Sequence, residues 1–229
     1  MTTTAQTTSF SRVTFGGEDL HLLADRAIWW PRTATLIVAD LHWGKDAAFR
    51  AQGIPLPGGV LDADLQRLRK LSSRLRPQHI LILGDLIHAR ASLTTEVIET
   101  VTAWRATEAA ACLLVEGNHD RHAPTLPSAW KIERVGPTFS DGALHFVHDP
   151  AHAPDAPCLA GHLHPSVNIR RGRRSWRLAC FQIGLSLGVL PAFSEFTGAG
   201  RLHPLPTQRI FPIMGGFCFE WESLPATVR

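Results

Sequence analysis

Three short apolar runs, each followed at once by polar residues, constrain the fold of this chain more than any other feature. Residues 35–39, 79–83 and 112–115 are nearly all apolar, which is typical of strands that are covered on both faces of a sheet. Helical patterns separate them, so the sequence predicts βαβ units and a layered α/β sheet. Polar residues 118–120 follow the third run. They would be costly at the end of a core strand unless the protein uses them.

The remaining segments predict one domain of two packed sheets. Residues 10–30 alternate around two glycines, as in a hairpin followed by a third strand, while 60–75 and 93–111 have helical patterns. Short β-like runs after residue 120 predict a second sheet: 130–135, 143–148, 158–160, 167–170 and 176–181. We expect residues 1–9 to be a disordered tail, residues 10–229 to form the single domain, and 185–229 to supply its last loops and strands.

Composition indicates the compartment but not the chemistry. The four cysteines form no Cys-x-x-Cys pair, so we expect buried, reduced thiols rather than a zinc ribbon or a disulfide framework. The polar N-terminus lacks the apolar core of a signal peptide. No apolar run approaches the roughly 18–20 residues of a membrane span. These features predict a soluble, cytoplasmic protein without a membrane partner, and they leave its oligomeric state open.

Five short motifs carry groups that bind metals, and each follows an apolar run. They are Asp40-x-His42, Gly84-Asp85, Gly117-Asn118-His119-Asp120, His148 and Gly161-His162-x-His164. Residues i and i+2 of an extended chain point the same way, so one strand end can present two ligands. This mixture of oxygen and imidazole groups suits Mn²⁺, Fe or Zn²⁺ better than Ca²⁺ or Mg²⁺. For the fourth motif, His145 and His152 remain alternatives.

The order and chemistry of these motifs resemble the calcineurin-like metallophosphoesterase superfamily. The resemblance implies an α/β fold, a two-sheet β-sandwich flanked by helices in four layers, α/β/β/α. It also implies two divalent metal ions, with Mn²⁺ expected and Fe or Zn²⁺ as alternatives. One ion would be held by Asp40, His42, Asp85 and His164. The other would be held by Asp85, Asn118, His148 and His162, with Asp85 bridging. His119 would protonate the leaving group, and Asp120 would orient His119.

Within that superfamily the chain resembles the bacterial ligase-associated DNA-damage-response endonucleases of the PdeM type. The resemblance is carried by residues 40–45, 49–50, 53–57, 84–88, 161–165 and 190–193. His88 stands where the wider superfamily has an aspartate. The resemblance implies a phosphodiesterase or nuclease acting on single-stranded or damaged DNA, in which a metal-held hydroxide attacks phosphorus. It also implies a DNA ligase, a helicase and an exonuclease as pathway partners. A hydrolase of small nucleotides or dinucleoside polyphosphates, and a non-catalytic repair scaffold, are the alternatives.

Basic residues provide the expected substrate contacts. Lys45 and Arg50 follow the first motif and could contact phosphates, although a salt bridge within a helix explains them equally well. The strongest charge cluster comprises Arg170, Arg171, Arg173 and Arg174, beside Trp176. Such a turn could hold a nucleic-acid backbone and stack a base. A solvated hairpin tip is the alternative.

Overall fold

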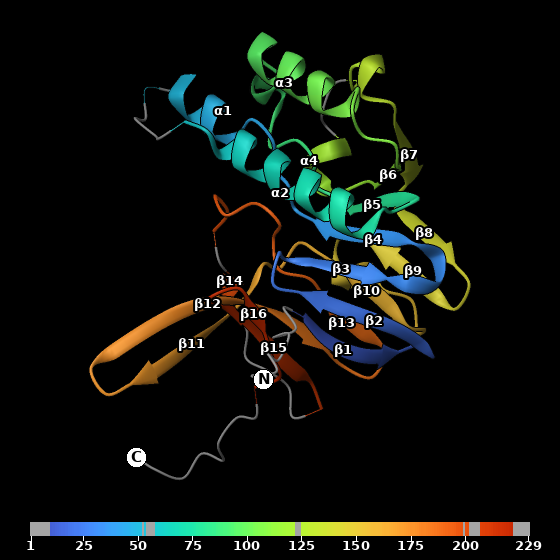
Figure 1. Cartoon of the computed structure of the whole chain (residues 1–229), viewed down its shortest axis with the longest axis vertical. Coiled ribbons are helices and arrows are strands. Elements are labelled where there is room, and N and C mark those ends of the chain that lie inside the picture. The colour runs from blue at the N-terminus through green and yellow to red at the C-terminus, as the bar shows by residue number, and fades with distance from the viewer. Residues whose placement is uncertain are drawn as a thin grey trace, which may run out of the picture.

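The first half of the chain builds a sheet whose seven strands follow one another in chain order (Figure 1). Strands β1 to β4 are antiparallel, and β4 to β7 are parallel. Their bounds are β1 Phe10–Phe15, β2 Glu18–Leu23, β3 Ala27–Trp30, β4 Thr35–Ala39, β5 His79–Leu83, β6 Ala111–Val115 and β7 Ile132–Gly136. The structure is a computed structural model that describes residues 10–51, 53, 58–121, 125–198, 200–201 and 207–221. The tail expected at 1–9 lies outside these ranges.

The helices pack against this sheet. They are α1 Lys45–Ala51, α2 Val60–Leu75, α3 Thr95–Arg105 and α4 Asn118–Arg121, with 3-10 turns η1 Pro31–Thr33, η2 Arg90–Ser92, η3 Ser128–Trp130 and η4 Pro150–His152. The bounds of α2 match the prediction, because Leu61, Leu65 and Leu68 are buried on one face of the helix. The helix expected over 93–111 is shorter. The Thr94 hydroxyl caps it by accepting from the Val97 amide, and the chain turns after Arg105 to reach β6.

The second half of the chain forms the second sheet. Its order is β14-β11-β12-β13-β10-β9-β8, and β15 extends it from β12. The bounds are β8 Thr138–Asp141, β9 Leu144–Val147, β10 Cys158–Ala160, β11 Pro165–Arg171, β12 Arg174–Ile183, β13 Leu187–Val189, β14 Gly200–Arg201, β15 Arg209–Met214 and β16 Phe217–Cys218. The run at 130–135 was expected here. That expectation was wrong, because this run becomes β7 and pairs with β6 of the first sheet.

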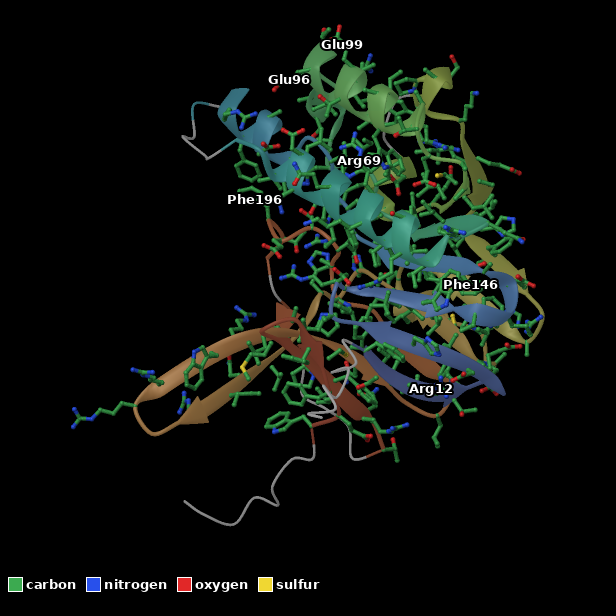
Figure 2. The ribbon with its side chains drawn as sticks, viewed as in Figure 1. Arg12, Arg69, Glu96, Glu99, Phe146 and Phe196 are labelled. Carbon is green, nitrogen blue, oxygen red and sulfur yellow. The ribbon has the colours of Figure 1, made fainter. Side chains whose placement is uncertain are left out.

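The inner faces of the two sheets share one core. Ile37 of β4 and Leu81 of β5 pack in the same buried cluster as Phe146 of β9 and Phe181 of β12. Figure 2 shows Phe146 within this two-sheet region. The alternate residues of the same strands, such as Val38, join the cluster under the helices. The central strands are therefore covered on both faces, as their apolar runs predict.

The predicted two-sheet α/β sandwich flanked by helices is confirmed, but the helices of the described ranges flank the first sheet only. In these ranges the layers therefore run helix, sheet, sheet, without the expected fourth layer. Val147, Cys158 and Ala160 form a minor cluster, and Ala153, from the stretch after β9, packs against it. None of the described helices is long and apolar enough to cross a membrane.

Candidate metal centre

The expected metal ligands stand where strands of both sheets end. Asp40, Asp85 and Asn118 follow the parallel strands β4, β5 and β6 of the first sheet. His148 and His162 follow β9 and β10, which are parallel neighbours in the second sheet. The carboxyl ends of parallel strands meet at one edge of a sheet. Stacking the two sheets therefore brings all five motifs to one place.

The backbone at these positions is unusual. Nine described non-glycine residues have positive φ, and five of them are expected ligands: Asp40 (56°), His42 (47°), Asp85 (50°), His162 (69°) and His164 (47°). A left-handed conformation costs roughly 1–2 kcal/mol for a residue with a Cβ. Concentrating it on the ligands is typical of a functional site. The residue types are only a weak signal for this conformation, because aspartate and histidine adopt it more often than most residues but do not require it.

Glycines beside the ligands leave space that a side chain would fill. A Cβ on Gly84 would lie 2.3 Å from His148 Nδ1, and one on Gly117 would lie 2.4 Å from Asp85 Oδ1. A Cβ on Gly161 would lie 2.7 Å from Asp40 Oδ2. Three of the motif glycines therefore let one sheet's backbone approach the ligands closely.

The first group of ligand atoms comprises Asp40, His42 and His164, whose donor atoms all lie within 4.8 Å of one another. His164 Nε2 lies 3.3 Å from Asp40 Oδ1. The other Asp40 oxygen accepts a hydrogen bond from the His162 amide at 2.9 Å, which ties the ends of β4 and β10 together. Asp40 is completely buried.

The second group comprises Asp85, His148 and His162, again with donor atoms within 4.8 Å. His148 Nδ1 donates to the Leu83 carbonyl at 2.9 Å, so its Nε2 is left to face the site. That Nε2 lies 3.0 Å from His162 Nδ1 and 3.0 Å from Asn118 Oδ1. All four expected members of this group are thus brought together.

The two alternatives to His148 point elsewhere. The His145 ring lies 2.9 Å from the Ser140 hydroxyl on the neighbouring strand β8, away from the ligands. The His152 side chain is 62% exposed beside Asp149. His148 alone of the three is buried among the ligand atoms.

Asp85 stands between the two groups. Its Oδ2 lies 3.4 Å from His148 Nε2 in one group and 3.9 Å from His42 Nε2 in the other. Its Oδ1 accepts from the His119 amide at 3.1 Å. This is the place that a bridging carboxylate would occupy.

The residues fit a pair of divalent cations. Several buried atoms at the site have no hydrogen-bond partner among the described residues: Asp40 Oδ1, His42 Nδ1 and Nε2, and His164 Nε2. Leaving such atoms unpaired in the interior is costly, and a metal ion would satisfy those that point at it. The mixed carboxylate, amide and imidazole set suits Mn²⁺, Fe or Zn²⁺.

Burial and charge set the protonation of the histidines. Burial lowers the pKa of His42 to about 3, so its ring is neutral and able to bind a metal. Burial also acts to lower the pKa of His148. The hydrogen bond to Asp85 and the charges of Asp40 and Asp85 outweigh it and raise that pKa to about 9. Without a metal, the carboxylates therefore hold a proton on His148, which a bound cation would replace.

His119 borders the site, and Asp120 has other partners than the expected one. The His119 side chain is 37% exposed, with Nε2 3.8 Å from Asp85 Oδ2, so it borders the site from the open side. Asp120 was expected to orient His119, but its carboxylate accepts from backbone amides instead. One oxygen accepts from Leu86 at 3.0 Å and the other from Gly117 at 3.0 Å. Asp120 thus joins the loops after β5 and β6, a role that its position in the motif did not reveal.

His88 lies beside two of the expected site residues. Its ring centroid lies 5.2 Å from that of His119 and 5.7 Å from that of His42. Phe49 of α1 stacks on its outer side at 5.9 Å. The signal in the sequence was the histidine that replaces an aspartate three residues after Asp85.

The residues expected to contact the substrate lie in two different parts of the structure. Lys45 begins α1, and its Nζ lies 5.9 Å from the Phe196 ring centroid; Figure 2 shows Phe196 near that helix. Arg50 pairs with Asp46 at 3.0 Å, so the helical salt bridge holds and the structure does not place Arg50 with the ligands. Arg170, Arg173 and Arg174 lie on the hairpin of β11 and β12, and the Arg171 side chain lies outside the described part of the structure.

Two cavities flank the ligands. One of about 150 Å³ includes His164 together with Ser166 and Arg177. The other, of about 290 Å³, includes Asn118 and His148. A larger cavity of about 590 Å³ lies against α2, but none of the expected ligands line it. We therefore place the candidate site at the strand ends, where the ligands are. Each ligand group therefore has a cavity beside it.

The fold and this centre together define the class of protein to which the chain belongs. The chain belongs to the calcineurin-like phosphoesterase family, whose profile matches residues 33–208, and it is a metal-dependent phosphoesterase. Among solved structures it is similar to the Pseudomonas putida nuclease MPE, with 33% identity and a TM-score of 0.81 over 93% of this chain and 100% of that one. This likeness agrees with the resemblance to a DNA-repair endonuclease that the sequence motifs carry.

More distant structures also match. YfcE, a phosphoesterase from E. coli, is 16% identical over 79% of this chain and 88% of that one, with a TM-score of 0.37. A predicted phosphoesterase from Streptococcus pneumoniae TIGR4 is 14% identical over 82% and 95%, with a TM-score of 0.32. No curated protein sequence matches the chain.

Proposed function

We propose that this protein is a phosphodiesterase and nuclease that uses two divalent metal ions, Mn²⁺ in the cell, to cleave single-stranded or damaged DNA. The observation that carries the proposal is the position of Asp85 between two groups of ligand atoms, with His119 at the open side. A pair of divalent ions supplies a nucleophile at neutral pH and neutralises charge on phosphoryl oxygens. Asp40, His42, Asp85 and His164 would hold one ion. Asp85, Asn118, His148 and His162 would hold the other.

The residues of the chain divide the remaining work. His119 lies at the rim, 3.8 Å from Asp85, where a protonated ring can donate to the oxygen that leaves phosphorus. Asp120 holds the backbone of its loop through the Gly117 and Leu86 amides, so it supports His119 indirectly. Burial keeps the rings and carboxylates of the expected ligands away from water and fixed in place, so the site is preorganised.

A diester substrate, rather than a monoester, is supported by the cavity beside each ligand group. A phosphodiester within a strand has groups attached on both sides of phosphorus. The cavities beside His164 and beside Asn118 would receive a chain that continues in both directions. The Pseudomonas putida protein with 33% identity is a nuclease, which supports the same reading.

The pathway is part of the proposal. The motifs shared with ligase-associated endonucleases favour a role in DNA repair beside a DNA ligase, a helicase and an exonuclease. Copurification of the tagged full-length protein with such partners from its own cells would test this part separately. Its failure would leave the chemistry of the centre unaffected.

In the decisive experiment the protein is loaded with Mn²⁺, Fe²⁺ or Zn²⁺ and then incubated with each of three substrates. These are bis-p-nitrophenyl phosphate, a single-stranded oligonucleotide and a dinucleoside polyphosphate. We expect hydrolysis of the diester and the oligonucleotide, fastest with Mn²⁺. If the protein cleaves only the dinucleoside polyphosphate, the nuclease proposal is wrong and the small-nucleotide alternative replaces it. Full metal content with no activity on any substrate would favour a non-catalytic scaffold.

A further inference from the structure

The hairpin of β11 and β12 has two chemically different faces. Ser166 pairs with Ala179, Asn168 with Arg177, and Arg170 with Ser175. Side chains alternate across a strand, and paired residues share a face. These six residues therefore form one face, which we call the polar face. The opposite face carries the apolar pairs Val167 with Leu178 and Ile169 with Trp176, together with Arg174 near the turn.

The base of the polar face forms a wall of the cavity at the metal centre. Ser166, Arg177 and Ala179 line the same cavity of about 150 Å³ as His164. Arg177 Nε donates to the Ser166 hydroxyl at 3.0 Å, which holds the guanidinium against this wall. Ala179 is small and leaves the floor open. The polar face is thus continuous with the site of the chemistry.

The acidic residue of this cavity is balanced by neighbours. Glu195 lies 3.2 Å from Arg67 and 4.0 Å from Arg26, so two guanidinium groups offset its charge. Arg26 itself lines the cavity. The cavity and the face that leads to it therefore favour an anion.

The outer part of the polar face reaches into solvent. Asn168, Arg170 and Ser175 are exposed, and the hairpin projects beyond the two sheets in Figure 1. At the rise of a strand, Arg170 stands roughly 13 Å further out than Ser166. A linear polyanion entering the cavity could contact the face along this length.

We propose that the polar face of the hairpin binds the phosphate backbone of a single DNA strand and directs it to the metal centre. This inference rests on the proposed function and names the surface that would select its substrate. Arginine binds phosphate at two points, and serine and asparagine add neutral donors. A cavity of about 150 Å³ has room for a phosphate group but not for a duplex. Trp176 is on the opposite face, so stacking on it takes no part.

The test measures the affinity of the metal-loaded protein for a short, labelled phosphorothioate oligonucleotide by fluorescence anisotropy at several salt concentrations. Arg170→Ala and Arg177→Ala should each weaken binding by about three- to tenfold at low salt and lower the salt slope by about 0.7, the value for one phosphate contact on a single strand. Arg170 is exposed, so its variant reports binding even if Arg177→Ala disturbs the hairpin.

Two matched variants decide whether the face matters. Arg174→Ala removes the same charge from the opposite face and should weaken binding much less. Arg69→Ala removes it from α2, which Figure 2 shows away from the hairpin, and should leave the salt slope unchanged. Equal losses in Arg170→Ala and Arg174→Ala would overturn the assignment of the face. Unchanged affinity in both Arg170→Ala and Arg177→Ala would overturn the inference.

The wild type separates this inference from the proposed function. A wild-type protein that cleaves DNA while all hairpin variants bind it normally would refute the polar face alone. A wild-type protein that hydrolyses bis-p-nitrophenyl phosphate but neither binds nor cleaves the oligonucleotide would refute both.

Discussion

His164 Nδ1 donates a hydrogen bond to the carbonyl oxygen of Gly198 at 2.8 Å, across 34 residues of chain. A carbonyl only accepts, so the proton stands on Nδ1 and Nε2 is left to face Asp40. The stretch that carries Gly198 is itself fastened to the first sheet, since Phe193 N donates to Ala39 O at 2.8 Å. The orientation of one expected ligand therefore depends on a loop far from it in the sequence.

Arg67→Ala should loosen that loop. Arg67 of α2 donates to the Phe193 carbonyl and pairs with the buried Asp64 at 2.8 Å. Removing it leaves a buried carboxylate without its partner, so we expect a loss of about 2–3 kcal/mol in the free energy of unfolding and weaker metal binding. Urea denaturation measures the loss. Arg69→Ala on the exposed side of the same helix should change stability by less than about 0.5 kcal/mol.

Gly84→Ala should damage the metal centre. The new Cβ would lie 2.3 Å from His148 Nδ1, at a φ of 74°. We expect a loss of roughly 3 kcal/mol in stability and incomplete metal loading, because the clash adds to the backbone strain. Gly136→Ala is the matched control, since its φ is 90° and no atom lies within 4 Å. It should cost only the strain, about 1–2 kcal/mol. Equal losses would show that the contact with His148 is unimportant.

Asp85→Asn should lower the occupancy of both metal ions. The carboxylate lies between the two groups, and an amide gives one neutral oxygen in its place. Elemental analysis after dialysis would measure two equivalents in the wild type and less than one in the variant. Asp40→Asn, which changes a carboxylate of the first group, should mainly empty that group. Full retention of one ion in Asp85→Asn would contradict a bridging role.

His119→Ala should reduce DNA cleavage by about 10²–10⁴-fold with the metal content unchanged, because the leaving alkoxide loses its proton donor. A nitrophenolate is stable as an anion and needs less help. The loss on bis-p-nitrophenyl phosphate should therefore be smaller. His152→Ala, at an exposed histidine, should match the wild type. Loss of bound metal in His119→Ala would instead assign His119 to the ligands.

Metal affinity should rise with pH. The metal-free protein holds a proton on His148, whose pKa is raised to about 9, and a cation at Nε2 must displace that proton. Below pH 9 each unit of acidification should weaken the apparent affinity by about tenfold for this proton. The raised pKa of His164 acts in the same direction. Titration against a chelator of known affinity at pH 7 and pH 8 measures the slope. An affinity that is equal at both values would mean that His148 binds no proton.

The sequence predicted the parts of the fold that local pattern determines. The strands β4, β5 and β6 are buried on both faces, so their composition alone identifies them. Leucine spacing and Pro77 set the bounds of α2. The residues at 106–110 favour a helix by composition, but the chain must turn there to enter β6. The run that became β7 shows that strand pattern identifies a strand but not the sheet in which it pairs.

Some features of the site could also be predicted from the sequence, and others could not. Ligands could be proposed because each follows a strand, and strand ends converge in this type of fold. The contacts of Asp120 could not be predicted. A carboxylate that follows a histidine can be the partner of that histidine or can hold the loop backbone, and the sequence does not distinguish the two. The arginines of the β11–β12 hairpin could be recognised in the sequence as a cluster of positive charge. Only the pairing of Asn168 with Arg177 and of Ile169 with Trp176 shows which residues share a face.

The order of strands in the first sheet has a consequence for synthesis of the protein. Because β1 to β7 pair with their neighbours in chain order, this sheet can form while the ribosome is still adding the second half. Asp40, His42, Asp85 and Asn118 would then be in place early. His148, His162 and His164 arrive only with the second sheet, so a nascent chain would hold only part of the ligand set. Tight binding of metal would then follow the docking of the two sheets.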